Sequence, residues 1–259
     1  MSEIKCGIQL YTVRSLCQTL EDTDRVLARL QTAGVHDIQV SGIGEMDWGR
    51  LSEIIKNHNM EVCVTHVPFD RIINDTDSVI EDHVKLGCDC IGIGCFPSEY
   101  ERTEEGSKQF IKDILPAAKK INGRNMHLTY HNHDFDVKPN GGKSILDGLI
   151  EDVPEELLWF VPDVAWLQIA GENPSEYLKR MVNRVKVIHF KDYFTDKDSG
   201  SHRFTELGKG LVNLDKCYET AQQMNIPYIM FEQDDNWTTD PVTSCIESFE
   251  YMKEIQLRH

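Results

Sequence analysis

Basic residues are scarce in this sequence relative to acidic ones. It contains 27 Lys and Arg against 43 Asp and Glu, which gives a formal net charge of -16 at pH 7. A surface with such an excess of negative charge repels the phosphates of nucleic acids and the anionic headgroups of membranes. We therefore expect no nucleic-acid partner and no attachment to a membrane.

Long hydrophobic runs and paired cysteine motifs are also missing. No apolar stretch reaches the roughly 20 residues that a membrane-spanning helix needs, and the segment that begins at Met1 lacks the basic start and apolar centre of a secretory signal. The eight cysteines form no C-x-x-C pair, and most lie in apolar segments. This pattern is typical of free thiols in a reducing compartment, so the sequence predicts a cytoplasmic protein.

A third absence concerns the fold. No glycine-rich dinucleotide fingerprint follows the first predicted strand, and no Ser/Gly/Pro-rich linker divides the chain. Short apolar runs alternate instead with amphipathic segments along the whole sequence. The predicted strands cover residues 4–11, 37–40, 61–66, 90–95, 126–133, 158–163, 185–191 and 228–232, and the predicted helices cover 20–33, 48–58, 75–86, 104–121, 144–151, 174–181, 214–224 and 239–257.

Eight strand–helix repeats within 259 residues predict parallel strands joined by right-handed crossovers. This number of repeats and this length are typical of a (β/α)8 TIM barrel, and an open doubly wound sheet is the alternative. We therefore expect an α/β protein in which residues 1–259 form one TIM-barrel domain. Residues 192–210 are predicted to form a polar loop, and Pro116 is expected to kink or break its helix.

Polar residues end four consecutive predicted strands. His131, Asp163, His189 and Glu232 each follow an apolar strand segment, and the carboxyl ends of the strands surround the active site of a TIM barrel. Imidazole and carboxylate ligands together suit Mn, Zn, Co or Fe, whereas Mg and Ca prefer oxygen ligands. The pattern predicts one divalent metal ion, with Mn or Zn favoured over Co, Fe or Mg. Structural roles are the alternatives: Asp163 as a helix cap, His189 as a core imidazole, and Glu232 in an ion pair with Lys191.

Six segments resemble a known family. They are GIQLYTVR (7–14), YHNHDF (130–135), DVAWLQIAG (163–171), VIHFKD (187–192), ELGKG (206–210) and FEQDDNW (231–237). On these segments the sequence is similar to the xylose-isomerase-like TIM barrels, which include sugar phosphate isomerases and epimerases. The resemblance implies a metal set of Glu, Asp, His and Glu from strands five to eight. Asp163, His189 and Glu232 match three of these ligands, but His131 stands where the first Glu is expected, in a context more similar to the inosose dehydratase branch.

The resemblance also implies a reaction that begins by removing a proton next to the carbonyl of a keto sugar, through an enediolate. Glu232 is the expected base, and His131 or His133 is the expected second proton carrier. Lys191 would stabilise an oxyanion or protonate a leaving hydroxyl; an ion pair with Asp192 or Glu232 is its structural alternative. The remaining substrate contacts expected from the resemblance are Gln9, Tyr11, His66, His133 and Trp166.

The first expectation for the activity is therefore a metal-dependent isomerase or epimerase of a keto sugar or sugar derivative. The runner-up is a metal-dependent dehydratase or lyase, either similar to inosose dehydratase or eliminating from a 3-keto glycoside. A sugar-binding barrel without catalytic activity is the second alternative. In each case the expected partner is a small sugar molecule, and the sequence leaves a homo-oligomer open.

Overall fold

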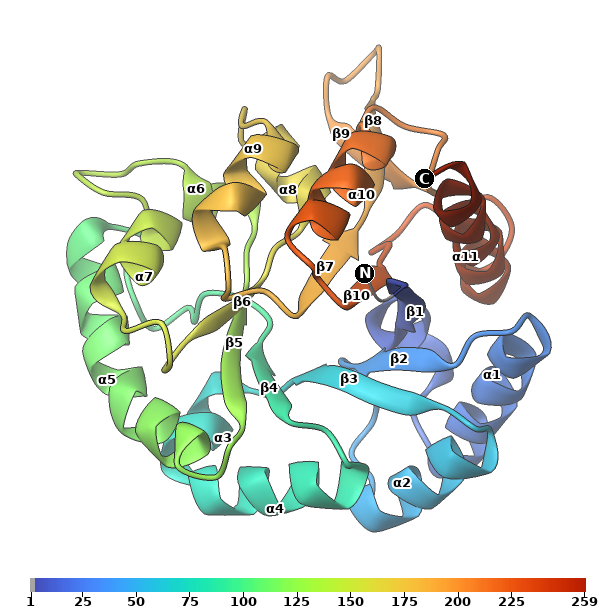
Figure 1. Cartoon of the computed structure of the whole chain (residues 1–259), viewed down its shortest axis with the longest axis horizontal. Coiled ribbons are helices and arrows are strands. Elements are labelled where there is room, and N and C mark those ends of the chain that lie inside the picture. Colours follow the sequence, from blue (N-terminus) through green and yellow to red (C-terminus); the bar gives the residue numbers. More distant parts are fainter. Residues whose placement is uncertain (1–2) are drawn as a thin grey trace.

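The computed structural model describes residues 3–259, so Met1 and Ser2 of the predicted domain lie outside the described residues. Eight parallel strands form a nearly closed barrel with helices packed around it (Figure 1). The barrel strands are β1 (Lys5–Gln9), β2 (Asp37–Val40), β3 (Glu61–His66), β4 (Cys90–Ile93), β5 (His127–His131), β6 (Trp159–Val161), β7 (Val187–Phe190) and β10 (Tyr228–Phe231).

The order of the strands confirms the predicted TIM barrel. Around the sheet it is β6-β5-β4-β3-β2-β1-β10-β7, and every neighbouring pair is parallel. The two ends of the sheet, β6 and β7, meet through isolated bridges between Phe160 and Val185 and between Asp163 and His189. An open doubly wound sheet would leave these two edges apart, so that alternative is excluded.

Helices follow the strands because the amphipathic segments bury one face against the barrel, and several of them begin at a capping residue. In α1, Val26, Leu27 and Leu30 are buried, and the side chain of Thr19 accepts a hydrogen bond from the Asp22 amide. The helices are α1 (Leu20–Thr32), α2 (Trp48–Asn57), α3 (Phe69–Asn74), α4 (Thr76–Leu86), α5 (Glu104–Asn122), α6 (Asp134–Val137), α7 (Ile145–Asp152), α8 (Val164–Ile169), α9 (Pro174–Leu178), α10 (Leu214–Gln223) and α11 (Pro241–Arg258), with the 3-10 turns η1 (Leu10–Leu16) and η2 (Lys179–Met181).

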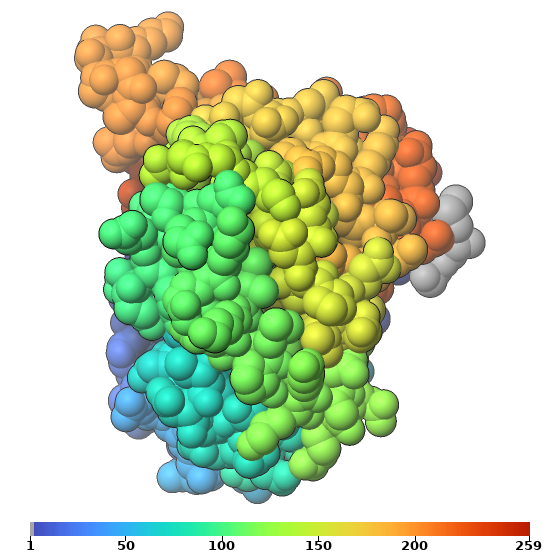
Figure 2. Space-filling view, turned by 90° about the vertical axis from the view of Figure 1, so that its left-hand side faces the viewer, coloured from blue at the N-terminus to red at the C-terminus, as the bar shows by residue number. Residues whose placement is uncertain are grey.

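Several local features differ from the sequence-based prediction, among them the short helices α6 and α8, which were not predicted. Helix α5 continues through Pro116, because buried residues on both sides of the proline hold it against the barrel. Helix α3 occupies a stretch predicted as a connection. The predicted polar loop contains an antiparallel hairpin of β8 (Asp192–Thr195) and β9 (His202–Thr205). The hairpin projects from the body of the molecule, as the orange segment at the top left of Figure 2 shows. Because its strands are not covered on both faces, they lack the apolar runs that mark the barrel strands.

No helix within residues 3–259 has both the length and the apolar character needed to cross a membrane. The eight cysteines are free thiols, and all of them except Cys95 are buried.

A buried histidine of α4 that faces β3 is expected to make stability depend on pH. His83 lies between the Thr65 hydroxyl and the Val79 carbonyl, 2.7 Å from each oxygen, and burial lowers its pKa from 6.5 to about 4. The folded state therefore favours the neutral ring. Its contribution is full above pH 6.5 and is lost as the pH falls toward 4, by about 3 kcal/mol in total.

Urea unfolding at pH 7.5, 5.5 and 4.5 measures this effect. We expect the His83→Gln variant, which keeps hydrogen-bonding groups but does not titrate, to lose less stability than the wild-type protein over this pH range. Equal losses in the two proteins would contradict the assignment.

Candidate metal and active site

The four residues predicted as metal ligands meet at the carboxyl end of the barrel. His131 ends β5, Asp163 follows β6, His189 lies in β7 and Glu232 follows β10. All four side chains are buried. Each offers a ligand atom, and these atoms lie within 4.8 Å of one another. The four strand ends thus form one compact cluster of two imidazoles and two carboxylates.

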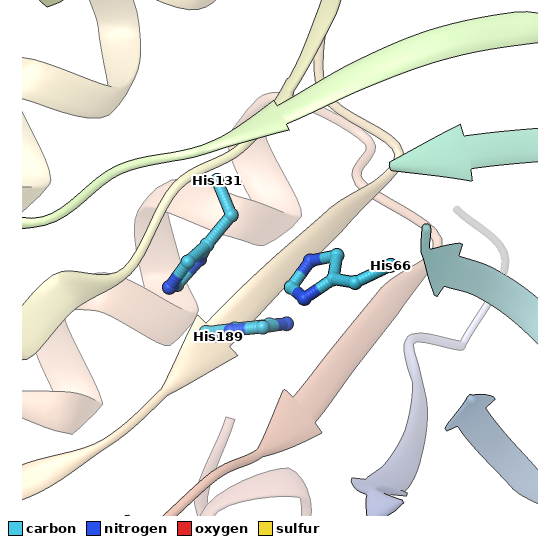
Figure 3. A group of neighbouring side chains, drawn as sticks. All are labelled: His66, His131 and His189. Carbon is cyan, nitrogen blue, oxygen red and sulfur yellow. The ribbon is translucent and has the colours of Figure 1, made fainter. Parts of the chain in front are cut away.

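A second group of possible ligands shares two members with the first. His66, at the end of β3, joins His131 and His189, and their three rings lie close together in Figure 3. The ring centres of His131 and His189 are 4.6 Å apart, and those of His66 and His131 are 5.4 Å apart. His66 therefore borders the cluster and is a candidate ligand by position.

Two glycines of the β4 segment make room for the His66 ring. A Cβ atom at Gly94 would lie 2.7 Å from His66 Nδ1, and one at Gly92 would lie 2.8 Å from His66 Cδ2. Both distances are shorter than van der Waals contact, so any larger residue would displace the ring. The sequence Gly92-Ile-Gly94 thus helps to set the position of His66.

The cluster has the properties of a cation site. His131 Nδ1 donates to the Val161 carbonyl over 3.2 Å, which leaves a lone pair on Nε2, 3.9 Å from Glu232. Asp163 Oδ1 accepts from the Trp166 amide, but its buried Oδ2 has no hydrogen-bond donor. Asp163 therefore caps α8, as the structural alternative predicted, and its second oxygen accepts no hydrogen bond, although the Lys191 ammonium lies 3.4 Å away. Buried acceptors without donors are costly, and a metal ion would satisfy several at once.

Lys191 brings a positive charge to the edge of this cluster. Its buried Nζ lies 2.9 Å from Glu232 Oε2, 3.4 Å from Asp163 Oδ2 and 3.0 Å from Asp234 Oδ2. Burial alone would lower the pKa of Lys191, but Asp234, Glu232 and Asp163 raise it above its usual value. Burial alone would raise the pKa of Glu232, but Lys191 and His189 hold it well below its usual value. The two groups therefore form an ammonium–carboxylate pair.

The predicted ion pair between Lys191 and Glu232 is thus present, whereas the one with Asp192 is not. Asp192 points away and accepts hydrogen bonds from the amides of Tyr193, Gly208, Gly210 and Val212.

Three imidazoles of the site, those of His66, His131 and His133, are neutral near pH 7. Burial is the main cause in each case: the pKa falls to about 3 for His66, to about 4 for His133, and well below 6.5 for His131. Burial also raises the pKa of Asp163 to about 6. Neutral imidazoles keep a lone pair for a metal or a hydrogen-bond donor, and Lys191 is the protonated group among them.

A cavity of about 790 Å³ opens beside the cluster. The predicted site residues that line it are Tyr11, His66, His131, His133, Lys191 and Glu232. Asp234 and Ser41, which were not predicted, line it as well. The lining also includes apolar residues, among them Val67, Pro68, Phe69, Ile93, Phe96 and Pro97, and the polar residues Asp70, Ser98 and Glu99. A cavity of this size and mixed polarity accommodates a small polyhydroxylated molecule.

Two predicted substrate contacts do not line this cavity. Gln9 is completely buried, and its side chain accepts from the Tyr11 amide because β1 ends there and the chain turns into η1. Trp166 packs against Phe204 and His133, with ring centres 5.1 and 5.3 Å away. Both residues therefore contact other parts of the protein around the site and do not face the cavity.

Besides Ser41, three other side chains belong to the site and were not predicted as site residues. Asn132 Oδ1 accepts from the Asp163 amide, Asp234 pairs with Lys191, and Gln39 contacts two histidine rings. Asp234 lies two residues after Glu232, so its place at the end of a predicted strand could have indicated a role in the site. Gln39 is the last polar residue of predicted strand 37–40, so that strand also gave a signal, but Gln39 was assigned no role in the site.

Comparison with known proteins places these features in a family. Residues 27–255 match the xylose isomerase-like TIM barrel family. The inosose dehydratase of Clostridium perfringens is 26% identical over 174 residues, a match that covers 61% of this chain and 58% of that enzyme. The chain thus spans less than two thirds of the length of this curated relative.

Solved structures show the same fold. A sugar phosphate isomerase/epimerase from Parabacteroides distasonis superposes with a TM-score of 0.77 at 18% identity, covering 98% of this chain and 94% of that one. The zinc-bound IolI protein superposes with a TM-score of 0.75 at 11% identity, covering 98% and 99%. Because the family match covers most of the sequence, the chain belongs to the xylose isomerase-like TIM barrel family.

Proposed function

We propose that the protein is a divalent-metal-dependent dehydratase that removes water from a keto sugar or keto polyol. One observation carries the proposal: the expected base and the protonated acid are neighbours, with Lys191 Nζ 2.9 Å from Glu232 Oε2. Adjacent groups address the same face of a bound substrate. Elimination on one face needs this arrangement, whereas inversion of one carbon needs proton carriers on opposite faces.

His131, Asp163, His189 and Glu232 would hold the metal ion, and the zinc of the similarly folded IolI protein supports a site of this kind. When bound, the ion would polarise the substrate carbonyl as a Lewis acid. Mn and Zn remain the favoured ions for this mixed ligand set.

The side chains themselves would move the protons. The Glu232 carboxylate takes the proton from the carbon next to the carbonyl, and the Lys191 ammonium donates one to the hydroxyl on the following carbon. Water leaves, and a double bond forms between the two carbons. The proton on Glu232 then returns to Lys191 across 2.9 Å, so that both groups are restored. The curated inosose dehydratase relative supports a loss of water.

An isomerase or epimerase is the second candidate, and His133 favours it. This residue lines the cavity, and its buried Nδ1 has no hydrogen-bond partner. A free ring nitrogen could return a proton at a second position of the substrate. His131 is less suited, because its Nδ1 is engaged by the Val161 carbonyl.

One experiment separates the candidates. The protein loaded with Mn²⁺ or Zn²⁺ is incubated with a panel of keto inositols and keto sugars in deuterated water, and products are followed by ultraviolet absorbance and mass spectrometry. Loss of 18 mass units, roughly one water, with a new enone absorbance supports the dehydratase. Deuterium uptake with an unchanged formula supports the isomerase or epimerase. Binding without either change supports the sugar-binding barrel.

Lys191→Met is expected to separate the two proton transfers. Elimination should fall by about 10²- to 10⁴-fold because the leaving hydroxyl loses its acid, while exchange of the substrate C–H with deuterium should fall much less. Lys138→Met is the matched control, since Lys138 pairs with Asp134 on the exposed surface. An equal loss of both reactions in Lys191→Met would argue against Lys191 as the acid.

A further inference from the structure

Gln39 connects two imidazoles that have different positions in the site. Its side chain comes from β2 and is completely buried. Gln39 Oε1 lies 2.6 Å from His189 Nε2, and Gln39 Nε2 lies 2.9 Å from His66 Nε2. One amide group thus contacts a candidate metal ligand and a residue that lines the cavity.

The amide determines which nitrogen of His189 carries hydrogen. A carbonyl oxygen only accepts, so the hydrogen of His189 lies on Nε2. In the neutral ring, Nδ1 is then without hydrogen and lies 3.1 Å from Glu232 Oε2. Two acceptors that face each other at this distance need a cation between or beside them. The Lys191 ammonium, 2.9 Å from the same Glu232 oxygen, is one such cation, and a metal ion bound by His189 Nδ1 would be a second.

The other end of the amide acts on His66. The amide nitrogen donates, so His66 Nε2 accepts, and the hydrogen of the neutral ring lies on Nδ1. His66 Nδ1 lies 3.3 Å from the hydroxyl of Ser41, another residue of the cavity lining. With Nε2 occupied and Nδ1 protonated, His66 has no lone pair for a metal. The amide therefore favours the ligand group that contains Asp163 and Glu232 over the group of three histidines shown in Figure 3.

We propose that Gln39 is a positioning residue: it keeps the metal-facing nitrogen of His189 free of hydrogen and, through the other end of the same amide, makes His66 a donor at Nδ1. The inference rests on the metal site of the proposed function and is independent of which reaction follows. A reversed amide would have the opposite effect. His189 would then carry its hydrogen on Nδ1, donate to Glu232, and leave the ligand set.

Zinc binding by the whole protein tests the His189 half of the proposal. Zn²⁺ alone is titrated into the wild-type protein, Gln39→Met and Gln39→Glu, by calorimetry or by competition with a chelating dye. We expect Gln39→Met to bind Zn²⁺ about 10- to 100-fold more weakly, because His189 loses the acceptor that orients it. Gln39→Glu should bind Zn²⁺ about as tightly as wild type, because a carboxylate oxygen also accepts from Nε2.

Gln31→Met is the matched control. Gln31 also contacts a histidine ring, with Oε1 2.9 Å from His58 Nδ1, but the pair lies on the outside of the barrel. The affinity of the Gln31→Met variant for Zn²⁺ should equal that of the wild-type protein. Circular dichroism of all variants shows whether they are folded.

Long-range proton–nitrogen NMR of the histidine rings tests both halves directly in the Zn²⁺-loaded protein. We expect hydrogen on Nε2 of His189 and on Nδ1 of His66 in the wild-type protein. In Gln39→Glu the hydrogen of His66 should move to Nε2, because the second carboxylate oxygen also accepts; a purely structural role of Gln39 predicts no such shift.

Three results would overturn the proposal. These are wild-type Zn²⁺ affinity in a folded Gln39→Met variant, hydrogen on His66 Nε2 in the Zn²⁺-loaded wild-type protein, and absence of Zn²⁺ binding by the wild-type protein. The third would remove the metal site as well. A protein that binds Zn²⁺ as expected but eliminates no water would refute the dehydratase alone.

Discussion

Glu232→Gln is expected to lower the turnover of substrate by about 10³-fold or more, which is within the range for loss of a general base. The amide cannot take up the proton from the substrate carbon. The substitution also removes the negative charge of Glu232 Oε2, which lies 3.1 Å from His189 Nδ1 and 2.9 Å from Lys191 Nζ. The affinity for the metal ion should therefore fall as well. Steady-state rates at saturating metal separate the loss of the base from the loss of the ion.

Glu206→Gln is the control for this prediction. Glu206 is also a buried carboxylate, but its oxygens accept from Thr238 and Ser244 and it does not line the cavity. This variant should keep its turnover even if its stability falls. If Glu232→Gln eliminated water as fast as Glu206→Gln does, another residue would have to be the base.

Asp192→Ala is expected to have the largest effect on stability, a loss of about 4 kcal/mol in the free energy of unfolding. The buried Asp192 carboxylate accepts from four backbone amides. Oδ1 bonds to Tyr193 and Val212, and Oδ2 bonds to Gly208 and Gly210, over 2.9–3.1 Å. Alanine would leave these N–H groups without a partner beside the segment that follows the hairpin. Urea unfolding at pH 7 measures the loss.

Two further substitutions calibrate the Asp192 prediction. Asp192→Asn keeps one acceptor oxygen and should lose about half as much stability. Asp196→Ala removes a carboxylate that also accepts backbone hydrogen bonds, from Asp198 and Ser199, but is only partly buried in the hairpin loop. That variant should lose less than about 1 kcal/mol, because water replaces the lost acceptor. A similar loss in Asp192→Ala would show that the four bonds are not needed.

Much of the barrel could be predicted from the sequence because its strands are short apolar runs that end at glycine, proline or polar residues. The predicted strands 37–40 and 61–66 coincide with β2 and β3. The convergence of the four predicted ligands also follows from topology alone, since parallel strands bring their carboxyl ends to one side.

The orientation of single side chains could not be predicted in the same way. Gln9 ends its strand as the predicted contacts do, but the 3-10 turn that follows uses it as a cap. Gln39 contacts His66 and His189, which are 27 and 150 residues away in the chain. Such contacts depend on the register of several strands at once, and strand periodicity carries no information about it.

The ligand cluster lies where the two edges of the sheet, β6 and β7, meet, so a bound ion would also affect how the barrel is closed. Elsewhere in the described barrel each strand is joined to its neighbour by a ladder of paired residues, with one register shift between β2 and β3, but here two isolated bridges close the ring. One of them joins Asp163 to His189, two of the four candidate ligands. An ion held by both residues would link β6 to β7 where the fewest backbone pairs join two neighbouring strands. Separation of these two strands would then require release of the ion.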